Sequence, residues 1–246
     1  MTNKYMYFIA NWKMYGNLSS LNTLNKVIKF SKSREINRGR LIYCPPYTLI
    51  SSFLKKFKDC QIDIGGQNCH ENESYGPHTG FINSRMLKNI GANYVIIGHS
   101  ENREKGDSDK LINLKIKSAL KANLKIIFCI GESLNDKRKK HTRVILSRQI
   151  KIGLNKIKNK SNLFIAYEPV WAIGTGIIPK SKDLFKTIEF IKSKFKGKSP
   201  RVLYGGSVNP KNIGELKEIN NIDGFLIGGA SQNSNKFIDI VKKTYS

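Results

Sequence analysis

The stretch LFIAYEPVWAIGTG, residues 163–176, joins a strand-like apolar run to a carboxylate and then to an apolar loop containing glycines. The run 163–167 has the length and the aromatic and β-branched content of a buried strand. Glu168 is therefore expected at the C-terminal end of that strand, where Pro169 ends the hydrogen-bond ladder. Residues 170–176 are too apolar for an idle surface loop, and we expect them to close over the carboxylate. The simpler alternative is a strand and a tight turn with a solvated glutamate.

Apolar runs of this kind alternate with amphipathic helical patterns along the whole chain. Eight strands are predicted, at residues 5–13, 41–45, 62–67, 94–98, 125–131, 163–168, 201–205 and 224–228. Apolar residues recur at helical spacing between them, for example over residues 111–120, 144–157 and 185–195. A repeat of about thirty residues is the size of a βα unit and predicts a parallel sheet. We therefore expect an α/β protein with a single domain over residues 1–246, a closed (β/α)8 barrel; the alternative is an open, doubly wound sheet.

The composition excludes a membrane-spanning chain. Apolar residues make up 39% of the sequence, the mean hydropathy is −0.38, and no run approaches the roughly 18 apolar residues of a membrane span. Residues 5–10 are apolar, but Asn11-Trp12-Lys13 interrupts them and no small-residue cleavage site follows. We interpret this segment as the first strand and not as a secretion signal.

The cysteines and histidines predict neither disulfides nor a metal site. Cys44, Cys60, Cys69 and Cys129 form no Cys-x-x-Cys pair, and the first and last of them lie inside apolar runs. Buried free thiols are typical of a reducing compartment, so we expect a cytoplasmic protein. Cys60, Cys69, His70 and His78 do not have the spacing of a zinc finger or of a zinc protease, so no metal is expected.

The chain is strongly basic, with 43 Lys and Arg against 18 Asp and Glu and a net charge of +25. Such an excess makes nucleic-acid binding the main alternative function. The lysines, however, are spread over nearly every predicted helix, and no basic cluster interleaved with aromatic residues stands out. A solvated outer face accounts for this pattern better, so we expect no nucleic-acid partner.

Reactive residues lie at the predicted C-terminal ends of five strands. They are Asn11 and Lys13, His99, Glu168, the turn Gly205-Gly206-Ser207 and the turn Gly228-Gly229. In a (β/α)8 barrel these ends meet at one mouth, where active sites lie. Each of these residues alone could be explained without a function, as a helix cap, a tight turn or a solvated strand end. Their convergence on one face favours a site.

The residue types at this mouth favour proton transfer on a small phosphorylated molecule. Glycine turns after strands seven and eight are the usual phosphate position of such barrels, because backbone N–H groups face the anion there. The sequence has no nucleophile elbow and no Gly-x-Gly-x-x-Gly fingerprint. Glu168 is the candidate general base, and His99 with Lys13 the groups that stabilise charge on a carbonyl oxygen.

Five blocks of the sequence, spread in order over the whole chain, resemble the triosephosphate isomerase family. They are Asn11-Trp12-Lys13, Ile97-Gly98-His99-Ser100-Glu101, residues 166–176, Tyr204-Gly205-Gly206-Ser207 and Gly228-Gly229-Ala230. The resemblance implies a TIM barrel that needs no cofactor and interconverts dihydroxyacetone phosphate and D-glyceraldehyde 3-phosphate through an enediolate, in glycolysis and gluconeogenesis.

The resemblance also assigns roles to single residues and implies a partner. Glu168 is implied as the base, His99 as the electrophile, and Lys13 and Asn11 as the substrate-binding pair. The phosphate group would be held by Gly174, Ser207, Gly228 and Gly229. A homodimer is implied as well, in which the loop 68–83 of one subunit reaches the other subunit beside Asn11 and Lys13, with Thr79 at the interface.

The sequence departs from the family pattern at several places, including Tyr15 and Gln232. Phe81 stands where most relatives have Glu and Asn102 where they have Arg, so an ion pair between subunits is missing. Ile177-Ile178-Pro179 differs from the usual second hinge of the lid. Two other hypotheses stay open: another phosphate-binding (β/α)8 enzyme, such as a sugar-phosphate epimerase or an amino-acid-biosynthetic isomerase, and a nucleic-acid-binding protein on an inactive barrel.

Overall fold

The computed structural model of the protein describes residues 4–246 and contains a closed barrel of parallel strands. The strands pair in chain order, and the barrel closes where Tyr7 of the first strand lies opposite Gly224 of the last. The strands are β1 (Met6–Asn11), β2 (Gly39–Cys44), β3 (Ile62–Gly66), β4 (Tyr94–Ile97), β5 (Lys125–Ile130), β6 (Leu163–Tyr167), β7 (Arg201–Tyr204) and β8 (Gly224–Ile227). The predicted (β/α)8 barrel is confirmed, and the open sheet is ruled out.

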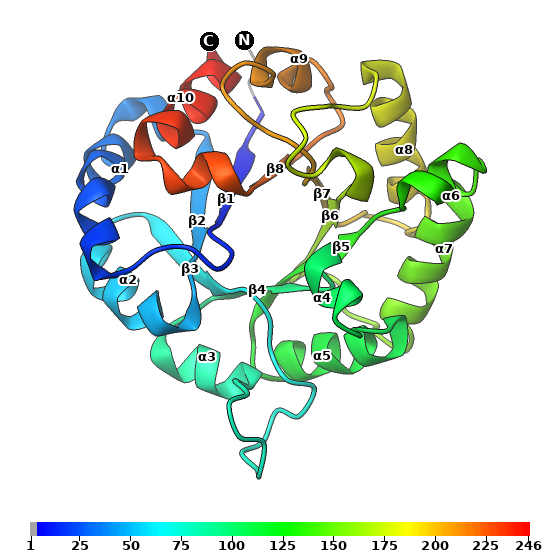
Figure 1. Ribbon diagram of the computed structural model, residues 1–246, viewed down its shortest axis with the longest axis horizontal. Helices are drawn as coiled ribbons and strands as arrows, with labels where there is room; N and C mark the ends of the chain where they lie inside the picture. The colour runs from blue at the N-terminus through cyan, green and yellow to red at the C-terminus, as the bar shows by residue number, and fades with distance from the viewer. Residues whose placement is uncertain (1–3) are drawn as a thin grey trace.

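Helices form a ring around the barrel (Figure 1). They are α1 (Asn25–Ser31), α2 (Ile50–Lys56), α3 (Ser84–Ile90), α4 (Ser100–Glu104), α5 (Asp109–Lys121), α6 (Leu134–Arg138), α7 (Thr142–Gly153), α8 (Ser181–Ser193), α9 (Ile213–Lys217) and α10 (Ser234–Tyr245). Short 3-10 helices lie at η1 (Leu18–Leu24), η2 (Arg34–Ile36), η3 (Tyr47–Leu49), η4 (Val170–Ala172) and η5 (Gly229–Gln232). None of the helices in residues 4–246 is both long and apolar enough to cross a membrane.

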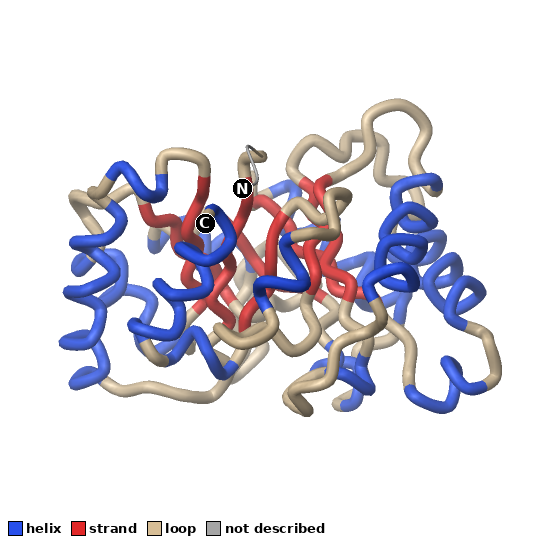
Figure 2. Tube along the Cα trace, turned by 90° about the horizontal axis from the view of Figure 1, so that it is seen from above, coloured by secondary structure: helices blue, strands red, loops and turns tan. Residues whose placement is uncertain are grey.

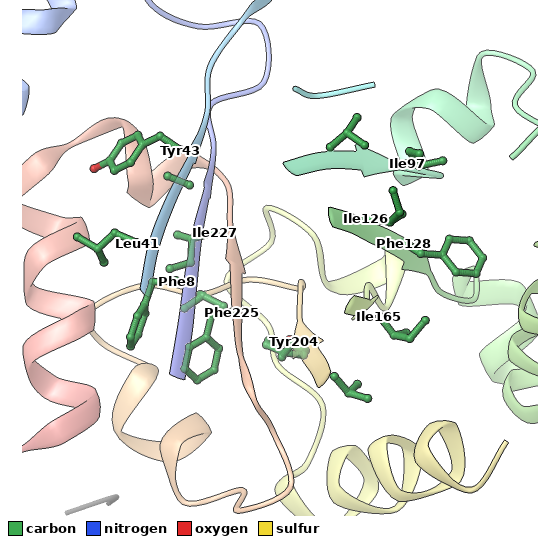
Figure 3. Packing of buried hydrophobic residues seen from close by; sticks show 14 of the residues in the cluster. Phe8, Leu41, Tyr43, Ile97, Ile126, Phe128, Ile165, Tyr204, Phe225 and Ile227 are labelled. Atoms are coloured by element: carbon green, nitrogen blue, oxygen red, sulfur yellow. The ribbon is translucent and has the colours of Figure 1, made fainter. Parts of the chain in front are cut away.

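The core has two layers because successive side chains of a strand point to opposite faces of the sheet. Phe8 of β1 packs outward with Phe225 and Leu41 against the helices, as Figure 3 shows, while Ile9 belongs to the cluster inside the barrel. In the view of Figure 2 the strands lie between helices on both sides. The interior is filled by side chains such as Ile42, Ile96 and Leu203, so the barrel is a packed core and not a pore.

Charged and aromatic side chains close the N-terminal end of the barrel. Nε of Arg40 lies 2.6 Å from Oδ2 of Asp63, and the Arg201 guanidinium lies over the rings of Tyr7 and Phe164, at 5.0 and 5.6 Å from their centroids. Cations over ring faces are attracted by the ring quadrupole. The opposite, C-terminal end is the one that remains open for a site.

The observed elements end earlier than the sequence patterns predict. The strand predicted at residues 5–13 covers Met6–Asn11, because Lys13 adopts a left-handed conformation with φ 55° and cannot continue the ladder. The helix predicted at residues 144–157 covers Thr142–Gly153. Gly153 packs so closely on the Phe128 ring that a Cβ there would lie 2.5 Å from Phe128 Cζ, and the chain turns away beyond it.

Candidate active site

A cavity of about 600 Å³ opens at the C-terminal ends of the strands. All eight residues that the sequence singles out line it: Asn11, Lys13, His99, Glu168, Gly174, Ser207, Gly228 and Gly229. They come from the ends of β1, β4, β6, β7 and β8 and from the loop after β6. The barrel thus brings together residues that are up to 218 positions apart in the chain.

Glu168 lines this cavity and is only 2% exposed. Its Oε1 lies 3.3 Å from Nε2 of His99, and its Oε2 accepts a hydrogen bond from the Ser100 N–H at 3.4 Å. Burial raises the pKa of Glu168, while the nearby His99, the Ser100 N–H and Lys13 lower it, and the net direction is upward. A carboxylate with a raised pKa is a stronger base than an ordinary glutamate.

Two glycines make room for Glu168. A Cβ at Gly205 would lie 2.9 Å from Cγ of Glu168, and one at Gly131 would lie 1.7 Å from its carbonyl oxygen. Both contacts are shorter than a side chain tolerates, so any larger residue would push Glu168 out of place. Gly131 follows β5 and Gly205 follows β7, the two neighbours of β6.

His99 is the N-cap of α4, and its ring orientation follows from that position. Its Nδ1 accepts a hydrogen bond from the Glu101 N–H at 3.2 Å. A nitrogen that accepts from a backbone N–H carries no proton itself, so the ring proton of the neutral imidazole lies on Nε2. Nε2 is the atom that faces Glu168, and it can donate to a substrate oxygen.

Lys13 and Asn11 border the cavity at the end of β1. Lys13 has φ 55°, a conformation that costs about 1–2 kcal/mol for a residue with a side chain. Its N–H donates to Oδ1 of Asn11 at 3.1 Å, and its carbonyl oxygen accepts from Nε2 of Gln67 at 2.8 Å. Its ammonium lies 2.7 Å from Oε1 of Glu101. These contacts hold a strained residue whose cation reaches the cavity.

The other end of the cavity is built for an anion. Within residues 4–246 the backbone N–H groups of Gly206 and Ser207 have no hydrogen-bond acceptor, and Gly229 begins the 3-10 helix η5. Free N–H groups and a helix start attract a phosphate group. Lys211 and Lys236 also line the cavity, and sequence reasoning missed both of them. The only signal for them was their short distance from the two glycine turns.

The loop after β6 is anchored at its start by a buried carboxylate that the sequence analysis also missed. Glu132 is 1% exposed and accepts hydrogen bonds from the Tyr167 hydroxyl at 3.1 and 3.2 Å and from Nε1 of Trp171 at 3.0 Å. The Nζ of Lys137 lies 3.2 Å from the centroid of the Trp171 ring. Burial raises the pKa of Glu132, although these hydrogen bonds oppose the shift.

The tip of the same loop contains two glycines with free space around them. Gly174 and Gly176 have φ 73° and 80°, values that favour glycine, and a Cβ at either would meet no atom within 4 Å. One end of the loop is therefore held by Glu132 while the tip has room to move. The arrangement fits a lid that closes when a ligand fills the cavity.

The site offers a base, an imidazole N–H, an ammonium and an anion cradle. In the described part of the chain, no three or more His, Cys, Asp or Glu side chains are grouped so that they could hold a metal ion. The four groups present can remove a proton from carbon and stabilise the oxyanion that results.

Comparison with known proteins identifies the family of the chain. The sequence model of the family described as triosephosphate isomerase matches residues 6–244. The triosephosphate isomerase of Thermodesulfovibrio yellowstonii is 40% identical over 244 residues, covering 96% of this chain and 98% of that protein. That of Rhizobium etli is 37% identical over 240 residues, covering 95% and 93%. A crystal structure of triosephosphate isomerase from Bartonella henselae superposes with a TM-score of 0.89 at 35% identity, covering 98% of this chain and 100% of that one. The chain therefore belongs to the triosephosphate isomerase family.

Proposed function

We propose that this chain interconverts dihydroxyacetone phosphate and D-glyceraldehyde 3-phosphate by proton transfer, with Glu168 as the base. Glu168 removes a proton from C1 of dihydroxyacetone phosphate, and the C–H electron pair forms the C1–C2 double bond while the carbonyl electrons move to the oxygen on C2. The enediolate then exchanges a proton between its two oxygens. Return of a proton from Glu168 to C2 gives the aldehyde, so no atom is gained or lost.

His99 and Lys13 stabilise the charge that develops on the substrate oxygens. Nε2 of His99 lies 3.3 Å from Oε1 of Glu168, and its N–H would donate to either oxygen of the enediolate. The ammonium of Lys13 adds positive charge on the same side, and Asn11 fixes the Lys13 backbone. Donors that are already oriented where charge develops cost no reorganisation during the reaction.

The phosphate group sits at the other end of the cavity. Ser207, Gly228 and Gly229 would hold it with backbone N–H groups, and Gly174 would join them when the lid closes. Closure would exclude water from the enediolate and limit loss of phosphate from that intermediate. The residues that follow β7 and β8 therefore bind the phosphate group, while those at the ends of β1, β4 and β6 act on the carbon and oxygen atoms that react.

The observation that carries the proposal is the contact between Glu168 and His99 in a cavity that also holds Lys13 and the anion cradle. The test is a coupled assay in which purified protein receives dihydroxyacetone phosphate and glyceraldehyde 3-phosphate formation is followed. Turnover without added metal or cofactor is expected. No turnover of this substrate, with turnover of another sugar phosphate, would favour a different phosphate-binding barrel enzyme.

We also propose a homodimer built around the loop between β3 and α3. Figure 1 shows this loop projecting beyond the ring of helices. It exposes Tyr75 (65%) and Phe81 (62%), and the loop after β1 exposes Met14 (94%). Exposed apolar side chains on two neighbouring loops favour burial against a partner. His70 packs on the Phe81 ring at 5.0 Å between centroids, so the projecting loop is ordered by its own contacts.

We further propose that the chain works as one domain in the cytoplasm. Closure between β1 and β8 leaves no seam at which the sheet divides. The four cysteines are free thiols, and Cys44, Cys69 and Cys129 are buried. Burial raises the pKa of the Cys69 thiol to about 12, so it stays protonated and unreactive. Free thiols fit a reducing compartment.

A further inference from the structure

The structure has a second cavity that the isomerase reaction does not use, at the N-terminal end of the barrel. It has a volume of about 760 Å³ and lies where β6, β7 and β8 begin, between the loop from α7 to β6 and the loop from α8 to β7. The active site opens at the other ends of the same strands. A ligand in this second cavity, which we name the basic cleft, would not compete with the substrate for space.

The basic cleft concentrates positive charge well beyond the average of the chain. Six of its eleven lining residues are Lys or Arg, compared with 43 of 246 in the whole sequence. The six are Lys158, Lys160, Lys192, Lys196, Lys198 and Arg201. They come from the loop before β6, from the loop before β7, from α8 and from the first residue of β7, and all of them border the same cavity.

The one carboxylate in the basic cleft is already neutralised. Asp223 lies 2.6 Å from Nζ of Lys4 through Oδ1 and 2.8 Å from Nζ of Lys192 through Oδ2, and it also accepts from the Val202 N–H at 2.8 Å. Burial of Asp223 acts to raise its pKa, but the hydrogen bonds from Lys192 and Lys4 outweigh burial and lower it. Asp223 therefore has no charge left to offset the other cations.

The remaining cations have no acidic partner. Within residues 4–246 no carboxylate lies within ion-pair distance of Lys158, Lys160, Lys196 or Lys198. Arg201 is steadied by the rings of Tyr7 and Phe164 instead of by a carboxylate. Like charges that share a concave space repel one another, and an anion that enters it relieves that repulsion.

We propose that the basic cleft binds a small anion that carries two or three linked phosphate groups. Its volume lies in the range of about 300–1,000 Å³ that is usual for small-ligand pockets, and charges on two facing walls suit several phosphates better than one. None of the lining residues in the described part of the chain is aromatic, so the cleft lacks the stacking platform of single-strand nucleic-acid sites. The ligand is therefore a compact polyphosphate and not a nucleic-acid strand.

The test uses sodium tripolyphosphate as the probe and isothermal titration calorimetry on the whole protein at about 0.1 M salt, where the Debye length is about 10 Å. We expect one saturable binding event. The variant Lys196→Gln/Lys198→Gln should bind at least about tenfold more weakly, because two of the phosphate-facing charges are gone. A second variant from the other wall, Lys158→Gln/Lys160→Gln, should lose affinity as well.

The control variant is Lys29→Gln/Lys55→Gln, which removes two exposed lysines from α1 and α2 and changes the net charge equally. It should bind tripolyphosphate within about twofold of the parent. All three variants should keep the parent kcat, because none of these lysines lines the active-site cavity. Equal weakening in the control would show a diffuse effect of net charge and overturn the proposal.

Two further measurements separate other sources of binding. Saturating dihydroxyacetone phosphate should leave tripolyphosphate affinity unchanged; if it abolishes binding, the probe occupies the active site and the proposal is wrong. A series of single-stranded oligonucleotides should bind no more tightly as length increases. Affinity that rises with length, together with no binding of tripolyphosphate, would replace the proposal with a nucleic-acid track.

Discussion

The Nε2 atom of His99 lies 3.3 Å from the Oε1 atom of Glu168, and both side chains are buried. Because Nδ1 of His99 accepts from a backbone N–H, Nε2 is the ring nitrogen that is left to donate a proton in a hydrogen bond. Nε2 therefore lies beside the carboxylate of Glu168, and a substrate carbonyl oxygen between the two residues would accept the hydrogen bond from its N–H. The reacting pair is assembled before the substrate arrives.

The raised pKa of Glu168 predicts the acid limb of the pH profile. Because burial raises its pKa above the ordinary value of 4.5, the base becomes protonated at a higher pH than a solvated glutamate would. On lowering the pH, kcat/KM should begin to fall while circular dichroism still shows a folded protein. The measurement is kcat/KM against pH; a decline centred at or below 4.5 would contradict the environment described for this carboxylate.

Removing the hydroxyl of Tyr43 and removing that of Tyr167 should have different effects on stability. The Tyr43 hydroxyl is buried with no hydrogen-bond partner in the described structure, whereas the Tyr167 hydroxyl donates to Glu132. An unpaired buried polar group costs about 1–3 kcal/mol, so Tyr43→Phe should leave stability unchanged or raise it. Tyr167→Phe should lower it, because a buried carboxylate loses a donor. Urea unfolding measures both, and a clear loss of stability in Tyr43→Phe would refute the first expectation.

We expect the positive charges of Lys211 and Lys236 to assist binding of the anionic substrate. Both line the active-site cavity near the anion cradle, and Lys236 lies in the first turn of α10, where the helix dipole disfavours a cation. The variant Lys211→Gln/Lys236→Gln should raise KM several-fold with kcat nearly unchanged, and its kcat/KM should depend less on salt than that of the parent. The control Lys29→Gln/Lys55→Gln should not change KM. An unchanged KM in the first variant would remove these lysines from substrate capture.

A substitution at Thr79 tests whether isomerase activity depends on the proposed homodimer. In the proposed dimer this exposed residue lies beside Lys13 of the other subunit, so Thr79→Arg would bring a bulky cation to a cationic site. We expect monomers with poor activity.

Since two highly basic subunits repel each other, added salt should tighten the parent dimer. Sedimentation across protein and salt concentrations decides: a fully active parent monomer contradicts the dimer, and dissociation by salt contradicts its electrostatics.

The barrel and the strand ends could be predicted from the sequence because they depend on local patterns. Alternating strand and helix periods gave the (β/α)8 barrel, and Glu168 stood out because Pro169 marks the end of an apolar run. The strand ends were predicted slightly too long. Lys13 and Gly98 look like strand continuations, but both adopt left-handed conformations, with φ 55° and 77°, that end the strands.

Contacts that depend on strand neighbours could not be read from the sequence. Glu132 was not singled out in the sequence, yet it is buried because β5 and β6 pair and bring Tyr167 and Trp171 over it. The basic cleft was hidden for the same reason. Four of its lysines lie on two loops that the sequence separates by a whole helix, the fifth lies in α8, and in the sequence all five were indistinguishable from a solvated face.

The central claim is that the carboxylate of Glu168, at its present position, takes the proton from carbon. The most direct test is kcat of Glu168→Asp, which keeps the charge but withdraws the carboxylate by about 1 Å. The control is Glu189→Asp, the same change on the exposed face of α8. We predict that Glu168→Asp folds normally and loses at least about 100-fold in kcat while the control keeps the parent value. A kcat within about twofold of the parent in Glu168→Asp would show that another group is the base.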